Sequence, residues 1–107
     1  MKLRPYIAHG DADRKVLGYH HWCPACNGPH GIATGQPNSS GAIWSFNGNL
    51  ERPTFTPSVR FFTTESGVEH TLCHYFITDG SIVFCGDNPH ALNGQTVPLP
   101  EYPERHE

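Results

Sequence analysis

The chain contains a cysteine-rich turn with the sequence Trp22-Cys23-Pro24-Ala25-Cys26-Asn27-Gly28-Pro29-His30, and we expect the fold to be organised around it. The Pro and Gly residues favour a tight turn that directs the sulfurs of Cys23 and Cys26 to one point, which is typical of half of a zinc site. Structural zinc usually takes four ligands, so later residues have to complete the site. A redox role is disfavoured, because redox Cys-x-x-Cys pairs are expected in a βαβ unit and these surroundings are strand-like.

The composition favours one small domain that is rich in turns. Hydrophobic residues make up 36% of the 107 residues and charged residues 16%, alongside 11 Gly and 10 Pro. We therefore predict a mainly β fold of antiparallel strands and hairpins with little helix, forming a single domain over residues 1–107. Residues 1–14 are expected to be an N-terminal lead, and residues 101–107 a frayed tail.

Charge and hydropathy exclude some classes of protein. The formal net charge is −3, so a basic surface for double-stranded nucleic acid is not expected. The sequence has neither an apolar stretch long enough to span a membrane nor the apolar core of a signal peptide. We therefore expect a cytoplasmic protein, in which the four cysteines are metal ligands or free thiols and not disulfides.

A second informative segment, residues 71–85, consists of two β-rich runs that meet at Asp79-Gly80. This dipeptide predicts a hairpin with a two-residue type I′ turn. The resulting register places His74 opposite Cys85. Because side chains alternate along a strand, Cys73 and His74 are expected to point to opposite faces.

This hairpin leaves two ways to complete a zinc site with the two cysteines of the turn. In the first, Cys73 is the third ligand and His90, just beyond the hairpin, is the fourth. In the second, His74 and Cys85 complete the site and Cys73 is a buried thiol. His30 competes for the fourth position in either arrangement, and the spacing alone does not choose between them.

Other segments give local expectations. Residues 52–58 contain two prolines and are expected to be extended, outside any central strand, whereas residues 58–64 are predicted to form a strand. Residues 90–92 are expected to form a helical turn, followed by a short edge strand. His20 and His21 are each interpreted as surface residues.

Five motifs occur together in order along the chain. They are Cys23-Pro24-Ala25-Cys26 with His30, Trp44-Ser45-Phe46-Asn47-Gly48, Pro53-Thr54-Phe55-Thr56-Pro57-Ser58, Cys73-His74-Tyr75-Phe76-Ile77-Thr78-Asp79-Gly80 and His90-Ala91-Leu92-Asn93-Gly94-Gln95-Thr96-Val97-Pro98-Leu99-Pro100. In these motifs the chain resembles a family of small phage and prophage proteins of unknown function, over about residues 22–100. Many members of that family have an apolar residue at the position of Cys85, which implies that Cys85 is not a required ligand.

The resemblance thus favours Cys23, Cys26, Cys73 and His90 as the zinc ligands, with His30, His74 and Cys85 as alternates. A closed site of this kind leaves no position for water and contributes to folding. Our preferred hypothesis is a structural zinc site in a small accessory module that binds a host or phage protein. On this interpretation the protein is not an enzyme.

The alternative hypothesis is a metal-dependent hydrolase. His30, His74, Asp87 and His90 would supply enough ligands for an open site, in which a bound water is activated. His74 and Asp87 are then the catalytic candidates, and Glu69 or Asp87 could act as the general base. We favour a supporting role for Asp87, as the acceptor of the free N–H of a ligating histidine.

A third hypothesis is a binder of single-stranded nucleic acid. Trp44, Phe46 and Phe55 could stack on bases, although core packing explains the first two better. The seven Lys and Arg residues are spread along the chain and form a poor electrostatic groove, so this hypothesis ranks last.

Overall fold

The computed structural model describes residues 1–7 and 15–103, which contain eight strands and no helix. Among these residues, no helix is long and apolar enough to cross a membrane. The strands are β1 (Arg4–Ile7), β2 (Val16–Cys23), β3 (Gly28–Ala33), β4 (Ser45–Phe46), β5 (Phe55–Glu65), β6 (Val68–Thr78), β7 (Ser81–Phe84) and β8 (Thr96–Pro98).

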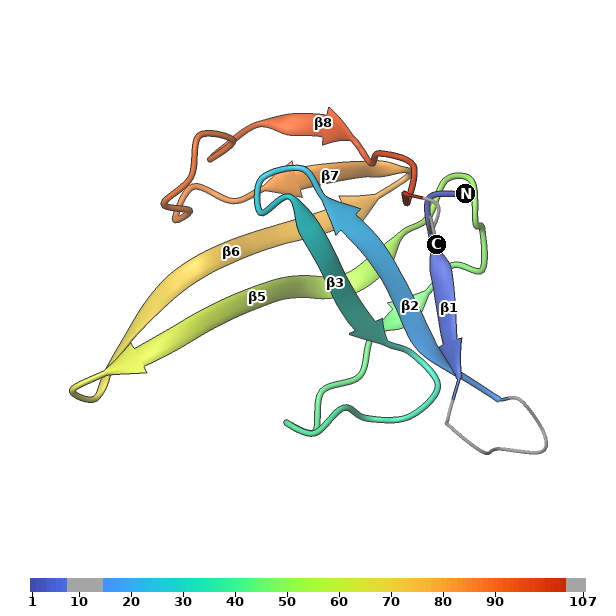
Figure 1. The fold of residues 1–107 in the computed structure, drawn as a ribbon, viewed down its shortest axis with the longest axis horizontal. Coiled ribbons are helices and arrows are strands. Elements are labelled where there is room, and N and C mark those ends of the chain that lie inside the picture. Colours follow the sequence, from blue (N-terminus) through green and yellow to red (C-terminus); the bar gives the residue numbers. More distant parts are fainter. Residues whose placement is uncertain (8–14, 104–107) are drawn as a thin grey trace.

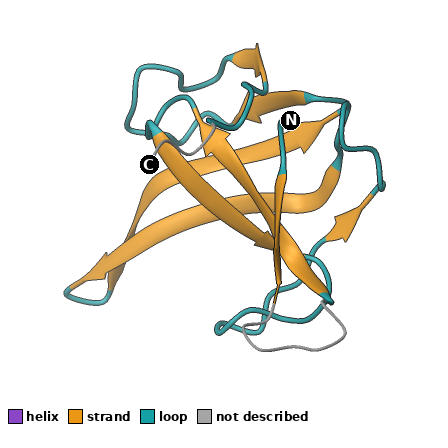
Figure 2. Cartoon of the chain, turned by 45° about the vertical axis from the view of Figure 1, so that its right-hand side comes forward, coloured by secondary structure: helices purple, strands orange, loops and turns teal. Residues whose placement is uncertain are grey.

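The strands form two antiparallel sheets, which confirms the predicted mainly β fold. The first sheet has the order β1-β2-β3, and the second has the order β4-β5-β6-β7-β8. Strands β2 and β3 cross over β5 and β6, and the long β5–β6 hairpin extends beyond the rest of the molecule (Figures 1 and 2). Each sheet therefore covers one face of the other over only part of its length.

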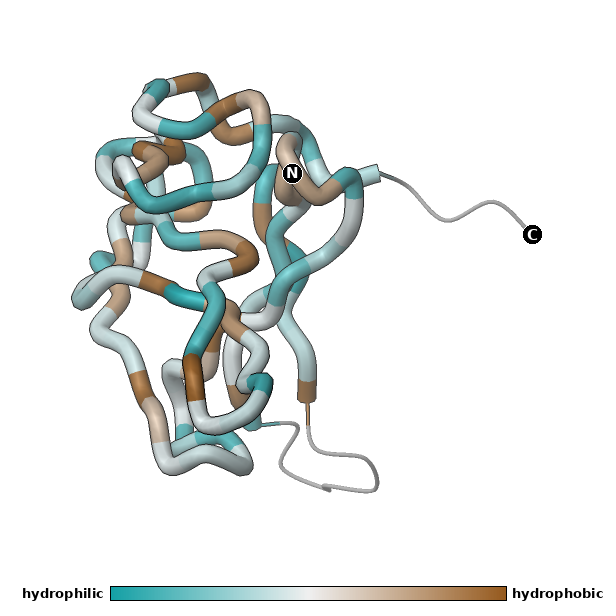
Figure 3. The backbone as a smooth tube through the Cα atoms, turned by 90° about the vertical axis from the view of Figure 1, so that its left-hand side faces the viewer, coloured by the Kyte–Doolittle hydropathy of each residue, from teal (hydrophilic) through white to brown (hydrophobic). Residues whose placement is uncertain are grey.

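The core lies between the sheets. Its buried members come from both sheets and from the segments next to them: Leu3, Cys23, Ile32, Phe55, Val59, Cys73, Tyr75, Ile77, Ile82, Phe84 and Leu99. Hydrophobic residues alternate with hydrophilic ones along most of the chain (Figure 3), as expected for strands with one buried face. Two of the predicted metal ligands, Cys23 and Cys73, belong to this core, whereas Cys26 is exposed.

The β6–β7 hairpin follows the predicted register. Thr78 pairs with Ser81 at the turn. Asp79 and Gly80 have φ angles of 50° and 83°, and positive φ at both central residues defines the predicted type I′ turn. Beyond the end of β7, the N–H of Cys85 donates to the carbonyl of His74, so the pairing continues to this position.

Strand β5 differs from the prediction, because it begins at Phe55 and includes Pro57. Phe55 pairs with Phe46 on one side and Ile77 on the other, so the expectation that this proline segment lies outside a central strand is wrong. The register shifts between Phe55 and Val59. Pro57, which has no N–H, therefore lies where the ladder between β5 and β6 is interrupted.

The described residues at the two ends of the chain contact each other. Residues 1–14 were expected to be a lead, yet they supply strand β1 and the buried Leu3; residues 8–14 lie outside the described residues. In the expected tail, Tyr102 donates a backbone hydrogen bond to Met1. Residues 104–107 also lie outside the described part of the chain. Residues 91–94 form a hydrogen-bonded turn, in which the N–H of Asn93 donates to the carbonyl of His90, and the expected short edge strand follows as β8.

Candidate functional site

One candidate site is built on the cysteine-rich turn between β2 and β3. Cys23 ends β2, and Asn27, with φ of 54°, closes the turn by donating from its N–H to the carbonyl of Cys23. The backbone N–H of Cys26 points to the sulfur of Cys23 at 3.4 Å. Local backbone geometry thus sets the relative positions of the first two cysteines.

The second sheet brings two more potential ligands to this turn. The Sγ atom of Cys73, on β6, lies 3.9 Å from Sγ of Cys23. Sγ of Cys73 also lies 3.6 Å from Nε2 of His90, which comes from the segment between β7 and β8. We refer to Cys23, Cys26, Cys73 and His90 as the thiolate cluster.

The three thiols interact electrostatically. The hydrogen bond from Cys73, together with backbone N–H groups and against the effect of burial, lowers the pKa of Cys23 to about 6. The same hydrogen bond raises the pKa of Cys73, and burial raises it further. Burial and the nearby charge of Cys23 raise the pKa of Cys26. The pKa values of Cys23 and Cys73 shift in opposite directions mainly because one thiol donates the hydrogen bond that the other, as a thiolate, accepts; repulsion between neighbouring thiolates adds to the rise at Cys73 and Cys26.

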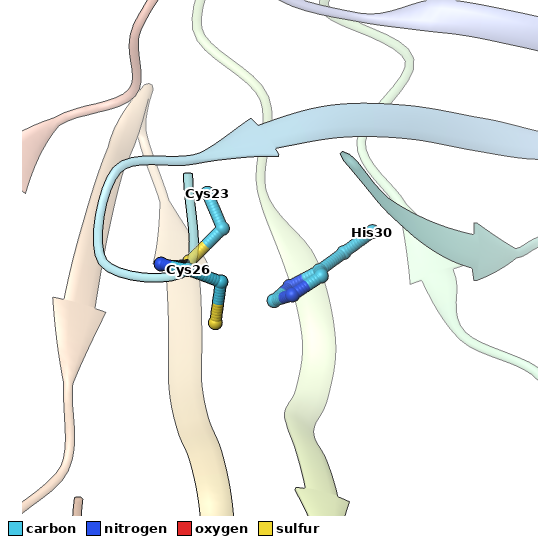
Figure 4. A group of neighbouring side chains, drawn as sticks. All are labelled: Cys23, Cys26 and His30. Carbon is cyan, nitrogen blue, oxygen red and sulfur yellow. Dashed lines mark hydrogen bonds between the residues drawn. The ribbon is translucent and has the colours of Figure 1, made fainter. Parts of the chain in front are cut away.

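His30 lies beside the thiolate cluster, and its ring extends toward Cys23 and Cys26 (Figure 4). One ligand atom from each of these three residues lies within 4.8 Å of the others. Together with Cys73, they are close enough to bind a metal ion. Burial lowers the pKa of His30 to about 4, so its ring is neutral at pH 7 and has a nitrogen lone pair for a metal.

A buried hydrogen-bond network that includes Tyr75 and His21 positions the ring of His30. The hydroxyl of Tyr75 lies 2.9 Å from Nδ1 of His30 and 2.6 Å from Nε2 of His21. The expectation that His21 is a surface residue is wrong, because His21 is fully buried. Burial lowers its pKa to about 3, so it is neutral as well.

A second candidate site lies on the other face of β6. His74 follows Cys73, and alternation along the strand directs its side chain away from the thiolate cluster. Its Nε2 atom lies 3.2 Å from Oγ of Ser58 on β5, and its Nδ1 atom lies 3.0 Å from Oδ1 of Asp87. These three residues form a continuous Ser–His–Asp chain, which we call the triad.

The protonation state of the triad follows from its contacts. An ionised carboxylate can only accept a hydrogen bond, so Nδ1 of His74 donates to Asp87, and in the neutral ring Nε2 then presents a lone pair to Ser58. Desolvation acts to raise the pKa of Asp87, but hydrogen bonds from His74 and Thr71 lower it below its ordinary value overall. Asp87 is therefore ionised at neutral pH. Its side chain is half exposed, whereas that of His74 is 24% exposed.

Asn88 links the segment that carries Asp87 to the strand that carries His74. Its Oδ1 accepts the N–H of His74 at 2.7 Å, and its Nδ2 donates to the carbonyls of His74 and Cys85. Asn88 is 9% exposed, so these bonds are shielded from water. They fix the segment that carries Asp87 against the strand that carries His74.

The structure separates the residues that the metal-hydrolase hypothesis combined. His30 and His90 lie with the cysteines, whereas His74 and Asp87 lie with Ser58. Cys85 joins this second group, since its sulfur, a nitrogen of His74 and an oxygen of Asp87 lie within 4.8 Å of one another. Glu69 is paired with Arg60 at 2.8 Å.

Sequence reasoning missed Ser58 and Asn88. In the sequence, Ser58 stands out only as the end of the Pro53–Ser58 motif. Its neighbours do not mark it as a nucleophile, because its partner His74 is 16 positions away. Asn88 directly follows Asp87, and a polar residue next to a candidate carboxylate was the only available signal.

Among the proposed stacking residues, Phe55 is 1% exposed and stacks on Phe46, so it is not accessible to a base.

Comparison with known proteins identifies a family. No curated protein and no solved structure matches the chain. The model of one protein family, described as bacterial ubiquitination-like system serine protease (BubE), matches residues 2–85. The matched region contains Ser58, His74 and the three cysteines of the thiolate cluster, whereas Asp87 and His90 lie just beyond it. Because the match covers most of the chain, this protein belongs to the BubE family.

Proposed function

We propose that the protein is a serine hydrolase that cleaves peptide bonds, as a component of a bacterial ubiquitination-like system. The observation that carries the proposal is the hydrogen-bonded chain from Ser58 through His74 to Asp87. Such a chain is recognised by its geometry and not by the order of its residues in the sequence. The description of the family as a serine protease supports the same chemistry. This proposal replaces our expectation that the protein is not an enzyme.

The geometry defines a role for each residue. Nε2 of His74 takes the proton of the Ser58 hydroxyl as Oγ attacks the carbonyl carbon of the substrate. The same proton then passes to the leaving amine as the C–N bond breaks, which leaves an acyl group on Oγ. Water then attacks the acyl carbon as His74 takes its proton; the bond from that carbon to Oγ breaks, the acid leaves, and His74 returns the proton to Oγ of Ser58. Asp87 keeps Nδ1 protonated and stabilises the positive charge that develops on the imidazole.

A fluorophosphonate probe tests the nucleophile directly. Attack by Oγ of Ser58 forms a P–O bond and expels fluoride, so a single adduct is expected on the peptide that contains Ser58. Ser58→Ala is expected to abolish labelling, whereas Ser45→Ala, a change at an exposed serine on β4, is expected to label like the wild type. Failure of the folded wild-type protein to react would overturn the proposal.

We further propose that the thiolate cluster binds a structural Zn²⁺ ion. Tetrahedral zinc, with Zn–S bonds of about 2.3 Å and Zn–N bonds of about 2.0 Å, places two sulfurs about 3.8 Å apart and a sulfur and a nitrogen about 3.5 Å apart. The corresponding distances here are 3.9 Å for Cys23 to Cys73 and 3.6 Å for Cys73 to His90. A cation at this point would also offset the repulsion between the thiolates.

A zinc ion at the thiolate cluster would stabilise the fold without taking part in the reaction. Four protein ligands leave no open position, and the triad lies on the opposite face of β6. The partner in this proposal is the protein substrate, not a passive binding partner. Phage or prophage origin and a cytoplasmic location stay predictions.

A second candidate function uses a metal at His74, Cys85 and Asp87, whose ligand atoms lie within 4.8 Å of one another. In that case the hydrolase would be metal-dependent, with His74 and Asp87 as ligands. We favour the serine mechanism, because the distances from His74 to Asp87 and to Ser58 are already those of hydrogen bonds. Cys85→Ser separates the two: activity unchanged by this variant supports the triad, and loss of activity restored by added metal supports the alternative.

A further inference from the structure

Strand β5 has a free edge next to Ser58. On the side away from β6, the only strand that pairs with β5 among the described residues is the two-residue strand β4, at Phe55 and Thr56. From Ser58 to Glu65, no strand among the described residues pairs with this edge. The carbonyl of Ser58 accepts a hydrogen bond from Nε1 of Trp44, so the unpaired part of the edge begins immediately after the proposed nucleophile.

The backbone N–H and C=O groups of Arg60 are directed toward this free edge, away from β6. Arg60 is opposite His74, and both backbone groups of His74 are used on the far side of β6, by Asn88 and by Cys85. In an antiparallel ladder, residues alternate between pairs that exchange hydrogen bonds and pairs that do not. Arg60 and His74 are therefore a non-bonded pair, which leaves the N–H and C=O of Arg60 directed away from β6.

A groove follows the same edge. Its volume is about 490 Å³, and one wall is β5 from Ser58 to Phe62, while residues 38–44 and Gly31 form the other. Asn38 stabilises the second wall, since its Oδ1 accepts the N–H groups of Ser40 and Ala42. The lining includes the aromatic rings of Trp44, Phe61 and Phe62 and contains no carboxylate.

We propose that this groove binds the substrate as an added β-strand. An extended peptide segment pairs with the N–H and C=O of Arg60, and this pairing places one of its carbonyl carbons at Oγ of Ser58. Apolar side chains of the segment contact the aromatic lining of the groove. The substrate class is therefore an unstructured, apolar peptide segment and not a folded loop. This inference rests on the proposed serine hydrolase and specifies what that enzyme accepts.

The test compares two substitutions at one position. Arg60→Pro removes the edge N–H, whereas Arg60→Ala keeps it; both remove the side-chain contacts to Glu69 and Thr71. The substrate is a library of eight-residue peptides with randomised sequence, and cleavage is followed by mass spectrometry. Arg60→Pro is expected to cleave the best peptide at least about tenfold more slowly than Arg60→Ala. Labelling of Ser58 by fluorophosphonate checks that the triad is intact in each variant before the cleavage rates are compared.

A second measurement uses the wild-type protein alone. N-methylation of the substrate amide that pairs with Arg60 is expected to reduce cleavage, while N-methylation of the next amide, which points away, is expected to leave it unchanged. Equal cleavage by the two Arg60 variants, or equal cleavage of the two N-methyl peptides, would overturn strand addition. So would a wild-type protein that reacts with fluorophosphonate but cleaves no peptide of the library. Failure of the wild-type protein to react at all would instead overturn the serine hydrolase itself.

Discussion

The imidazole of His74 lies 3.2 Å from the hydroxyl of Ser58, although the two residues belong to different strands that are out of regular register at this point. The shift between Phe55 and Val59 leaves Ser58 outside the ladder pairs. An irregularity of this kind commonly redirects a side chain next to a functional site. The contact between Ser58 and His74 therefore lies next to an interruption of the sheet.

Asp87→Asn is expected to reduce kcat/KM by roughly 10³–10⁴-fold, because an amide stabilises the wrong tautomer of His74. The rate of peptide cleavage measures this directly. Asp79→Asn is the matched control: Asp79 is also an exposed carboxylate, but it pairs with Arg52 at the hairpin turn. Equal activity of the two variants would show that Asp87 has no role in catalysis.

Asn88→Ala is expected to lower the free energy of unfolding by about 2–4 kcal/mol, because buried backbone groups of His74 and Cys85 lose their partners. It is also expected to reduce kcat more than it raises KM, since Asp87 would no longer be held against His74. Urea denaturation and steady-state kinetics measure the two effects. Asn47→Ala removes a comparable set of amide contacts at an exposed turn and should change the unfolding free energy by less than 1 kcal/mol.

Cys26→Ser is expected to remove the bound metal and to destabilise the fold, because the ion supplies folding free energy. Native mass spectrometry gives the metal content, and thermal melting gives the stability. Cys85→Ser is the matched control, since Cys85 lies with His74 and Asp87 and is expected to keep one zinc ion per chain. A wild-type protein purified without chelator that contains no metal would contradict the zinc proposal.

His90→Ala is expected to weaken zinc binding strongly, whereas His30→Ala is expected to retain the ion. The reason is the 3.6 Å distance from His90 to Cys73, which matches an edge of a zinc tetrahedron. Competition with a chelator gives the affinity of each variant. If His30→Ala loses zinc and His90→Ala keeps it, the fourth ligand is His30, positioned by its hydrogen bond with Tyr75.

The sequence could predict features that are set by local chemistry. Asp79-Gly80 determined the hairpin, because few dipeptides adopt positive φ twice in succession, and the register then placed Cys73 and His74 on opposite faces. The cysteine turn was predictable because it combines two metal-ligating residues with turn-forming Pro and Gly. Both features depend on residues close together in the chain.

The triad could not be predicted in the same way. Serine is common and has no distinctive neighbours in the sequence, so Ser58 becomes a candidate only when His74 is seen beside it. That contact lies next to an interrupted register, and the prolines at the interruption favour, from sequence alone, a segment outside the sheet. The burial of His21 was missed for a similar reason, because its partner Tyr75 comes from the other sheet.

The alternation of Cys73 and His74 constrains how this family can change in length. Insertion or deletion of a single residue between Cys73 and the Asp79-Gly80 turn would reverse the faces of β6, so the thiol would point toward Ser58 and the imidazole toward the cysteines. Substitutions in this segment can be neutral, but a change of one residue in its length disables both sites at once. The segment from Cys73 to the turn is therefore a fixed spacer, and gaps in aligned relatives should be confined to other parts of the chain.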